Sequence, residues 1–236
     1  MKTALVTGSA RGIGRGVALD LAEAGFGVAI HYRSSVDEAE KTRLEAQSFG
    51  VQAVKLQADL TDSIQAEKLV LEAANQLGGL GVLVNNVGNY KKGALTEMPL
   101  EEWHEMFDTN LHSSFYTCRA AIPIMRLQKF GRIINFGYAG ATNLISRPRT
   151  TAYVIAKTGV TLMTKAIAAT EIQHGITANV IAPGVIENSI SQPITDIPAA
   201  RIGRIDEVSS AVLYFLSDQA QYVTGQTLEI AGGWNL

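Results

Sequence analysis

Thr7-Gly8-Ser9-Ala10-Arg11-Gly12-Ile13-Gly14 is the segment in which a predicted strand turns into a predicted helix. The apolar run Thr3–Val6 precedes it, and apolar side chains with helical spacing follow it over Ile13–Ala24. A glycine-rich turn of this kind directs backbone N–H groups and the helix N-terminus towards a pyrophosphate, and Gly14 would let the helix pack closely on the strand. The segment therefore predicts a dinucleotide site, although its spacing differs from the commoner G-x-G-x-x-G pattern.

Short apolar segments alternate with longer amphipathic segments along the rest of the chain. This alternation is typical of βαβ units and predicts a mainly parallel sheet with helices on both faces. Strands are expected at Thr3–Val6, Val28–Tyr32, Ala53–Gln57, Val82–Val84, Ile133–Phe136, Thr177–Ile181 and Thr227–Ile230. Helices are expected at Ile13–Ala24, Val36–Phe49, Ser63–Leu77, Leu100–Leu127, Ala152–His174 and Glu207–Ser217. The prediction is one α/β domain over residues 1–236, a doubly wound Rossmann-type fold with seven strands.

The composition excludes several classes of protein. Lys and Arg number 20 against 22 Asp and Glu, so no net positive charge favours nucleic acid or an anionic membrane surface. The apolar run at the N-terminus is too short for a signal segment or a membrane span. Cys118 is the only cysteine, which excludes an intrachain disulfide and favours a cytoplasmic protein, and the four histidines have no ligand-like spacing, so no metal site is expected.

The residues after the second predicted strand bear on which dinucleotide binds. In such folds an acidic residue at this position binds the ribose 2′-hydroxyl of NAD(H), whereas a basic residue accommodates the 2′-phosphate of NADP(H). Here the strand runs into Arg33-Ser34-Ser35, and Arg11 in the glycine turn could approach the same group. The sequence favours NADP(H) over NAD(H). The alternative is that both arginines are solvated surface charges.

Tyr153 and Lys157 form a candidate catalytic pair. They are four residues apart in a predicted helix, so both side chains project from one face. A nearby ammonium favours the phenolate, and we therefore expect Lys157 to lower the pKa of Tyr153 and make it a usable proton donor.

Several motifs follow one another in a fixed order along the chain. They are Thr7-Gly8-x-x-x-Gly12-x-Gly14, Asp59-Leu60, Asn85-Asn86-Val87-Gly88, Asn110, Tyr153-x-x-x-Lys157, Pro183-Gly184 and the ending Val223-Thr224-Gly225-Gln226 with Gly232-Gly233. With these motifs the chain resembles the classical short-chain dehydrogenases/reductases over essentially its whole length. It is most similar to their 3-oxoacyl-[acyl-carrier-protein] reductase branch.

The resemblance implies a role for each matched residue. Tyr153 would protonate the developing alkoxide, Lys157 would hydrogen-bond the nicotinamide ribose, and Asn110 would hold a water of the proton relay. The implied cofactor-binding residues are Gly8, Ser9, Arg11, Gly12, Ile13, Gly14, Arg33, Ser34, Asp59, Leu60, Asn86, Val87, Gly88, Tyr153, Lys157, Pro183, Gly184 and Ile186. The implied activity is NADPH-dependent reduction of a ketone to a secondary alcohol, with a 3-oxoacyl thioester as the leading substrate, by a homotetramer or dimer.

The chain departs from the family pattern after the fifth predicted strand. Family members usually carry a serine there that hydrogen-bonds the substrate carbonyl, whereas Tyr138, or Gly140 in a shifted alignment, occupies that position here. Three interpretations stay open. Tyr138, Thr142 or Ser146 replaces the hydroxyl, or the enzyme works without it, or the chain is a dinucleotide-binding regulator or scaffold with little turnover.

A second departure lies beyond Pro183-Gly184, where the family has its substrate lid. The segment of about 185–201 is short and has no clear periodicity, and it contains Pro193 and Pro198. A shortened lid is expected, either over an open pocket for a bulky or carrier-bound substrate or with little influence on selectivity. Asn188 stands where the family often has a threonine for the carboxamide.

Overall fold

A single parallel sheet organises the computed structural model, which describes residues 2–189, 192 and 194–235. Within these residues the sheet has seven strands in the order β3-β2-β1-β4-β5-β6-β7, and each neighbouring pair is parallel. The strands are β1 (Thr3–Val6), β2 (Gly27–Tyr32), β3 (Ala53–Gln57), β4 (Val82–Asn85), β5 (Gly131–Phe136), β6 (Ile176–Pro183) and β7 (Thr227–Ile230). The predicted α/β class is confirmed, and the sheet is entirely rather than mainly parallel.

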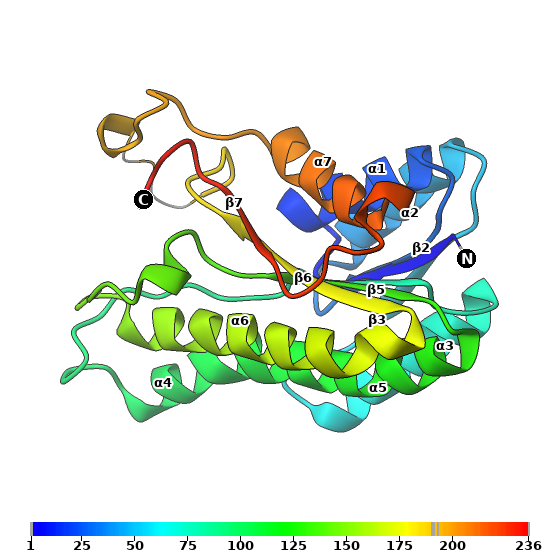
Figure 1. The fold of residues 1–236 in the computed structure, drawn as a ribbon, viewed down its shortest axis with the longest axis horizontal. Helices are drawn as coiled ribbons and strands as arrows, with labels where there is room; N and C mark the ends of the chain where they lie inside the picture. Colours follow the sequence, from blue (N-terminus) through cyan, green and yellow to red (C-terminus); the bar gives the residue numbers. More distant parts are fainter. Residues whose placement is uncertain (1, 190–191, 193, 236) are drawn as a thin grey trace.

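Helices cover both faces of this sheet (Figure 1). They are α1 (Gly12–Glu23), α2 (Val36–Ser48), α3 (Ser63–Leu77), α4 (Leu100–Phe107), α5 (Ser113–Gln128), α6 (Thr151–Glu171) and α7 (Ile205–Leu216). Side chains alternate along each strand, so Ala4 and Val6 belong to the core under α1, α2 and α7, whereas Leu5 belongs to the core under α3 and α5. Both faces of β1 are therefore buried, which explains its continuous apolar sequence.

The order of the strands places the functional site. From β1 the chain moves outwards to β2 and β3, and it then returns to β4 on the other side of β1. The turns after β1 and β4 consequently separate at the carboxyl edge of the sheet, which is where ligands bind in folds of this class. The glycine turn follows β1 and the segment Asn86–Gly88 follows β4.

The prediction of one continuous helix over Leu100–Leu127 is wrong, because a π-helical turn at Asp108–His112 separates α4 from α5. Side chains occupy backbone acceptors there: Thr109 Oγ1 donates to the Glu105 carbonyl at 2.7 Å, and Asn110 Nδ2 donates to the Met106 carbonyl at 3.0 Å. Such bonds compete with the helical ladder and fit a wider turn. The turn carries Asn110.

The described residues of the predicted lid form little regular secondary structure. Val185 and Ile186 are buried, Ile186 forms a parallel bridge with Gly203, and a short 3₁₀ turn lies at Ile194–Asp196. Ile190, Ser191 and Pro193 of this segment lie outside the described residues. Among the described helices, none combines the length and apolar character needed to cross a membrane.

Candidate active site

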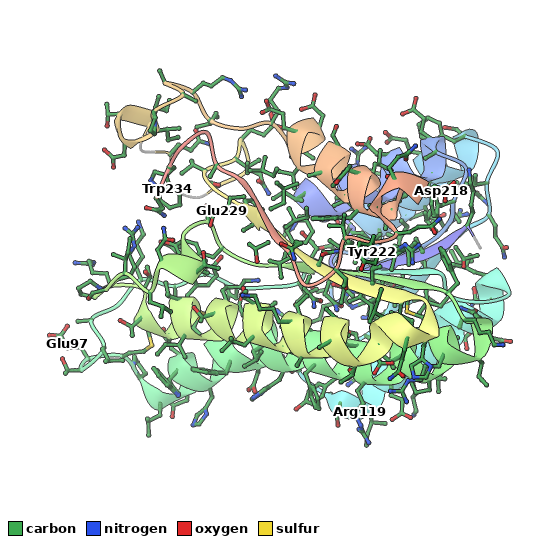
Figure 2. The ribbon with its side chains drawn as sticks, in the orientation of Figure 1. Glu97, Arg119, Asp218, Tyr222, Glu229 and Trp234 are labelled. Atoms are coloured by element: carbon green, nitrogen blue, oxygen red, sulfur yellow. The ribbon has the colours of Figure 1, made fainter. Side chains whose placement is uncertain are left out.

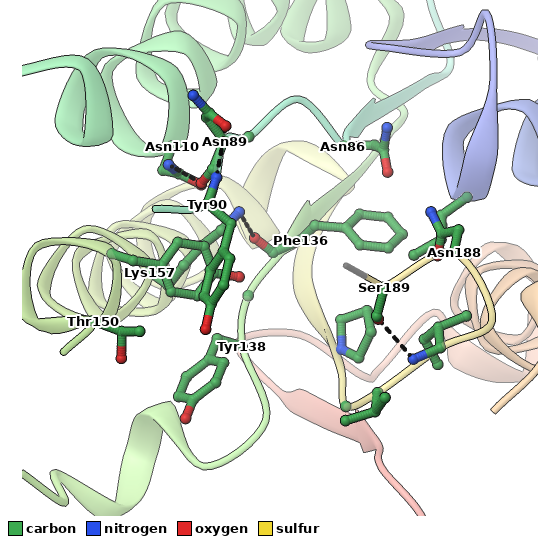
Figure 3. Close-up of a pocket in the computed structure, with 18 of the residues that line it drawn as sticks. Asn86, Asn89, Tyr90, Asn110, Phe136, Tyr138, Thr150, Lys157, Asn188 and Ser189 are labelled. Carbon is green, nitrogen blue, oxygen red and sulfur yellow. Dashed lines mark hydrogen bonds between the residues drawn. The ribbon is translucent and has the colours of Figure 1, made fainter. Parts of the chain in front are cut away.

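Two neighbouring hollows lie at the carboxyl edge of the sheet. The first, which we call the central cavity, has a volume of about 530 Å³. Its lining residues are Ile13, Asn86, Gly88, Asn89, Tyr90, Asn110, Phe136, Gly137, Tyr138, Arg147, Thr150, Tyr153, Lys157, Pro183, Gly184, Val185, Ile186, Asn188, Ser189 and Trp234. They come from the loops that follow β4, β5, β6 and β7, from the starts of α1 and α6, and from the π-helical turn that carries Asn110 (Figure 3).

The second hollow, which we call the Arg33 pocket, has a volume of about 310 Å³ and adjoins the first, since Gly88 and Asn89 line both. Its lining residues are Gly8, Ala10, Arg11, His31, Tyr32, Arg33, Ser34, Ser35, Ala58, Asp59, Leu60, Thr61, Val87, Gly88, Asn89, Glu105, Thr109 and Ser113. Together the two hollows collect most of the predicted cofactor-binding residues in one groove.

The turns after β1 and β4 are joined by hydrogen bonds. The Thr7 hydroxyl accepts from the backbone N–H groups of Asn86 at 2.9 Å and Val87 at 3.2 Å. In return, Asn86 Nδ2 donates to the carbonyls of Thr7 at 3.0 Å and Gly8 at 3.2 Å. These bonds fix the distance between the two sides of the groove.

The glycine turn has the shape of a phosphate cradle. Gly8 and Gly12 have φ angles of +64° and +59°, a conformation that favours glycine. A Cβ atom on Gly14 would lie 2.5 Å from Asn86 Nδ2, so this glycine permits close packing. The first N–H groups of α1 have no partner within the helix and are directed out of its N-terminus. The residues present therefore fit the pyrophosphate of a dinucleotide.

Ser9 was expected among the cofactor-binding residues, but its polar groups are used within the protein. Its side chain is buried and donates to the Val6 carbonyl at 2.7 Å, and its backbone N–H donates to the His31 carbonyl at 3.0 Å. Ser9 also lines neither hollow. Its role in the structure is to hold the glycine turn against β2.

His31 is a part of the site that the sequence did not indicate. Its Nε2 lies 3.1 Å from the Ala58 carbonyl, which can only accept, and its Nδ1 accepts from the Gly8 N–H at 2.9 Å. Both contacts require the neutral ring with a proton on Nε2, and burial lowers the pKa of His31 to about 4. The ring connects the glycine turn to the segment before Asp59.

The Arg33 pocket contains charges of both signs. Burial acts to raise the pKa of Asp59, yet hydrogen bonds from Thr61 and the charge of Arg33 lower it. The pKa of Glu105 is lowered first by Lys91, and also by Asn89 and Arg33. Arg33 thus lies close enough to two carboxylates to influence both, while it and Arg11 stay exposed.

Tyr153 and Lys157 lie in the central cavity, as predicted from their spacing, but their electrostatics differ from the prediction. Lys157 Nζ donates to the Phe136 carbonyl at 2.8 Å, and burial lowers the pKa of Lys157 to about 8 (Figure 3). The pKa of Tyr153 is raised, because burial disfavours the phenolate and the neighbouring Tyr138 and Tyr90 add to the rise. The expected lowering by Lys157 is therefore wrong for this arrangement, and the phenol keeps its proton.

Asn110 also reaches the central cavity. Its Nδ2 donates to the Asn89 carbonyl at 2.9 Å, whereas its buried Oδ1 accepts no hydrogen bond from a described residue. The position that a Cβ atom on Gly88 would take is 2.5 Å from Asn110 Oδ1 and 3.2 Å from Lys157 Nζ. A buried carbonyl oxygen of this kind normally has a partner, and a water between Asn110 Oδ1 and Lys157 Nζ would supply one.

Of the three candidates for the missing hydroxyl, Tyr138 alone lines the central cavity, because Thr142 and Ser146 are exposed and lie outside the lining. The Tyr138 ring meets the Tyr153 ring edge to face, with centroids 5.7 Å apart. Its phenolic oxygen accepts a hydrogen bond from Asn235 Nδ2 at 3.1 Å, which leaves the phenolic proton available to another acceptor.

Three further residues of the cavity were not predicted from the sequence. Tyr90 meets Tyr153 edge to face at 5.1 Å, and Trp234 meets Tyr138 edge to face at 6.1 Å. Arg147 is the third. Figure 2 shows Trp234 on the segment that follows β7, far in sequence from the loops it adjoins. Nothing local marks these residues, since the fold alone brings them together.

Comparisons with known proteins agree with this geometry. The family model described as enoyl-(acyl carrier protein) reductase matches residues 8–235. A 3-oxoacyl-[acyl-carrier-protein] reductase, FabG, of Staphylococcus aureus is 38% identical over 241 residues, which cover 98% of this chain and 97% of that protein.

Two solved structures are also similar over nearly their whole length. The acetoin dehydrogenase YohF from Salmonella typhimurium is 34% identical with a TM-score of 0.91, covering 99% of this chain and 95% of the other. A blue fluorescent protein from a metagenomic library, solved in complex with NADPH, is 31% identical with a TM-score of 0.92, covering 100% and 98%.

Proposed function

Since the chain belongs to the classical short-chain dehydrogenases/reductases, we propose that it uses NADPH to reduce a ketone to a secondary alcohol, with a 3-oxoacyl thioester as the leading substrate. The observation that carries this proposal is the convergence of Tyr153, Lys157 and the unpartnered Asn110 Oδ1 on one cavity. A protein that only bound a dinucleotide would have no need for a proton donor, an ammonium and an unpartnered carbonyl oxygen in the same cavity.

Different residues of the groove would bind different parts of the dinucleotide. The N–H groups of the glycine turn would hold the pyrophosphate, Asp59 and Leu60 would lie beside the adenine, and Lys157 would hydrogen-bond the nicotinamide ribose. Arg33, with Arg11, supports the preference for NADPH, because a guanidinium binds a phosphate in bidentate fashion and both side chains line the same pocket. The NADPH complex of the metagenomic relative is in line with this preference.

When bound, the nicotinamide supplies the hydride. Tyr153 would donate its phenolic proton to the developing alkoxide, and its raised pKa keeps that proton in place until the oxygen becomes basic. Lys157 would hold the charge from which the proton of Tyr153 is restored, and Asn110 Oδ1 would hold the water that connects Lys157 to solvent. The chain contributes orientation and electrostatic stabilisation.

Tyr138 would replace the missing serine hydroxyl. Asn235 donates to its oxygen, and this hydrogen bond makes the phenolic proton a better donor to a substrate carbonyl. Tyr138 and Tyr153 would then hydrogen-bond the same carbonyl oxygen from two sides, with Tyr138 polarising it and Tyr153 giving up its proton.

The assembly and the cellular location remain predictions from the sequence. Large apolar side chains are exposed on the long helices and the last strand, with Phe115 at 47%, Leu162 at 63% and Leu228 at 36% exposure. These surfaces support a homotetramer or dimer built from α5, α6 and β7. The single, buried Cys118 supports a cytoplasmic setting.

The test combines binding with turnover. NADPH and NADH are titrated by fluorescence, and NADPH consumption is then followed over a panel of ketones and 3-oxoacyl thioesters with Tyr153→Phe as the control. We expect tighter binding of NADPH and turnover that Tyr153→Phe abolishes. Tight NADPH binding without turnover of any substrate would contradict the reductase and favour a dinucleotide-binding regulator, and tighter binding of NADH would contradict the role of Arg33 and Arg11.

A further inference from the structure

Arg147 is a charged residue of the central cavity that the proposed reaction does not use. It lines the cavity together with Tyr90, Tyr138 and Thr150, and it lies on the loop between β5 and α6. The two cationic side chains of the lining are Arg147 and Lys157, and no aspartate or glutamate is among the described lining residues. Because Lys157 belongs to the proton relay and the ribose, the charge of Arg147 is left for another group.

The loop of Arg147 is held in place by backbone and side-chain contacts. The Gly93 N–H donates to the Arg149 carbonyl at 2.8 Å, which joins this loop to the one that carries Tyr90. The Arg147 guanidinium donates to Asn235 Oδ1, and Asn235 Nδ2 donates to the Tyr138 hydroxyl at 3.1 Å. The Asn235 amide therefore joins Arg147 to the tyrosine that faces Tyr153, which places the guanidinium at the wall of the reaction site.

The positive charge of Arg147 affects the pKa values of two tyrosines that line the cavity. Burial raises the pKa of both Tyr90 and Tyr138, and the positive charge of Arg147 opposes the rise in both. Arg147 donates to one neutral amide oxygen, and within residues 2–189, 192 and 194–235 it has no carboxylate partner. A guanidinium has five N–H donors, so most of its hydrogen-bonding capacity remains for a ligand.

We propose that Arg147 is a substrate-binding residue, and that the natural substrate is a ketone carrying a carboxylate a few carbon atoms from the carbonyl. The proposal rests on the reductase function and narrows its substrate class. The carboxylate would bind the guanidinium in bidentate fashion while the ketone oxygen lies between Tyr138 and Tyr153. The aromatic rings of Tyr90, Tyr138 and Trp234 would exclude water around the short chain that joins the two groups.

Two kinds of molecule have this chemistry: a free short oxo acid, and a 3-oxoacyl thioester whose acyl chain ends in a carboxylate. The experiment includes both, each beside its uncharged methyl ester. One arm compares 4-oxopentanoate with methyl 4-oxopentanoate. The other arm compares the N-acetylcysteamine thioesters of a 3-oxo dicarboxylic acid and of its methyl half-ester. A preference for the charged member in only one arm identifies the source of the carboxylate.

The variants are Arg147→Gln, Arg147→Lys and the matched control Arg149→Gln, which removes an exposed arginine of the same loop that does not line the cavity. We expect kcat/KM for the charged member to fall about 10- to 100-fold in Arg147→Gln, chiefly through KM, with the ester changed less than about threefold. Arg147→Lys should recover part of the loss, and Arg149→Gln should match the parent.

A second measurement tests the carboxylate subsite at Arg147 without depending on turnover. Dissociation constants of the charged and ester compounds are measured on the NADP⁺-saturated protein, in which no reduction occurs. Weaker binding of the charged compound to Arg147→Gln supports the subsite even where turnover is absent. Equal binding of acid and ester to the parent protein, or an equal loss of both in Arg147→Gln, would overturn the proposal.

Discussion

The central cavity and the Arg33 pocket belong to one groove but differ in the burial of their charged groups. In the cavity, Lys157 is buried, the described lining has no carboxylate, and the pKa values of Tyr153 and Lys157 are shifted mainly by burial. In the pocket, Arg11 and Arg33 are exposed, and Asp59 and Glu105 lie near Arg33. Under the proposed function, burial would control the rate of the reaction and surface charge the choice of cofactor.

The largest effect is expected in the cavity, from Tyr153→Phe. The substitution keeps the ring and its packing but removes the proton donor, so kcat should fall about 10³-fold. Fluorescence titration should give nearly unchanged NADPH affinity, because the cofactor contacts in the Arg33 pocket remain. Tyr222→Phe, at a side chain that is 97% exposed, is the matched control and should leave kcat unchanged. A Tyr153→Phe protein with more than a tenth of the parent activity would remove Tyr153 from the mechanism.

A smaller effect is expected from Tyr138→Phe, because this change removes a hydrogen-bond donor to the carbonyl but not the acid. The loss of such a donor typically costs about 10²-fold in kcat. Steady-state kinetics on the best substrate of the panel, with Tyr90→Phe measured beside it, distinguishes the hydroxyl of Tyr138 from a general effect on the aromatic wall. If both variants lose activity equally, Tyr138 has no special role in place of the serine.

In the Arg33 pocket we expect a change of selectivity rather than of rate. Arg33→Gln removes a charged partner of the 2′-phosphate, so the affinity for NADPH should fall about 30-fold while that for NADH stays nearly constant. The loss should shrink at high salt, because both arginines are exposed. Arg119→Gln, on the exposed surface of α5, is the control. An equal change for both cofactors would show that Arg33 does not contact the phosphate.

The last expected effect is the dependence of reduction on pH, which is small near neutral pH. The pKa of Lys157 is about 8, so its ammonium is present below this pH and is lost as the pH rises through it. Reduction that depends on the ammonium should therefore fall about tenfold per pH unit above the pKa. The pH profile of kcat measures this, and Lys157→Arg should shift the fall to higher pH. A flat profile between pH 7 and 10 would contradict a titrating lysine in the cavity.

The sequence predicted the regular parts of the fold well, for a physical reason. The bounds of β1, β3 and β7 match the structure, because short runs of strand-forming residues between turn residues identify strands. The π-helical turn at Asp108–His112 could not be predicted, since one extra residue per turn hardly changes the pattern of apolar side chains. It depends on side-chain bonds that only the folded helix makes.

The candidate site was predictable where its residues lie in motifs and not elsewhere. Tyr153, Lys157 and Asn110 were identified from spacing and resemblance, and the structure brings them to one cavity. Tyr90, Arg147 and Trp234 belong to three loops that are distant in sequence. The shift of the Tyr153 pKa was predicted with the wrong sign, because burial, its largest cause, depends on the whole fold and not on the spacing of two residues.

In the proposed function, one NADPH molecule spans both hollows, with its reacting end at Tyr153. A crystal structure of the protein with NADP⁺ tests this most directly. The result predicted is a 2′-phosphate against Arg33 and Arg11, a pyrophosphate at the N-terminus of α1, and a nicotinamide ribose within hydrogen-bonding distance of Lys157 and Tyr153. A dinucleotide bound elsewhere, or with its nicotinamide directed away from Tyr153, would contradict the account.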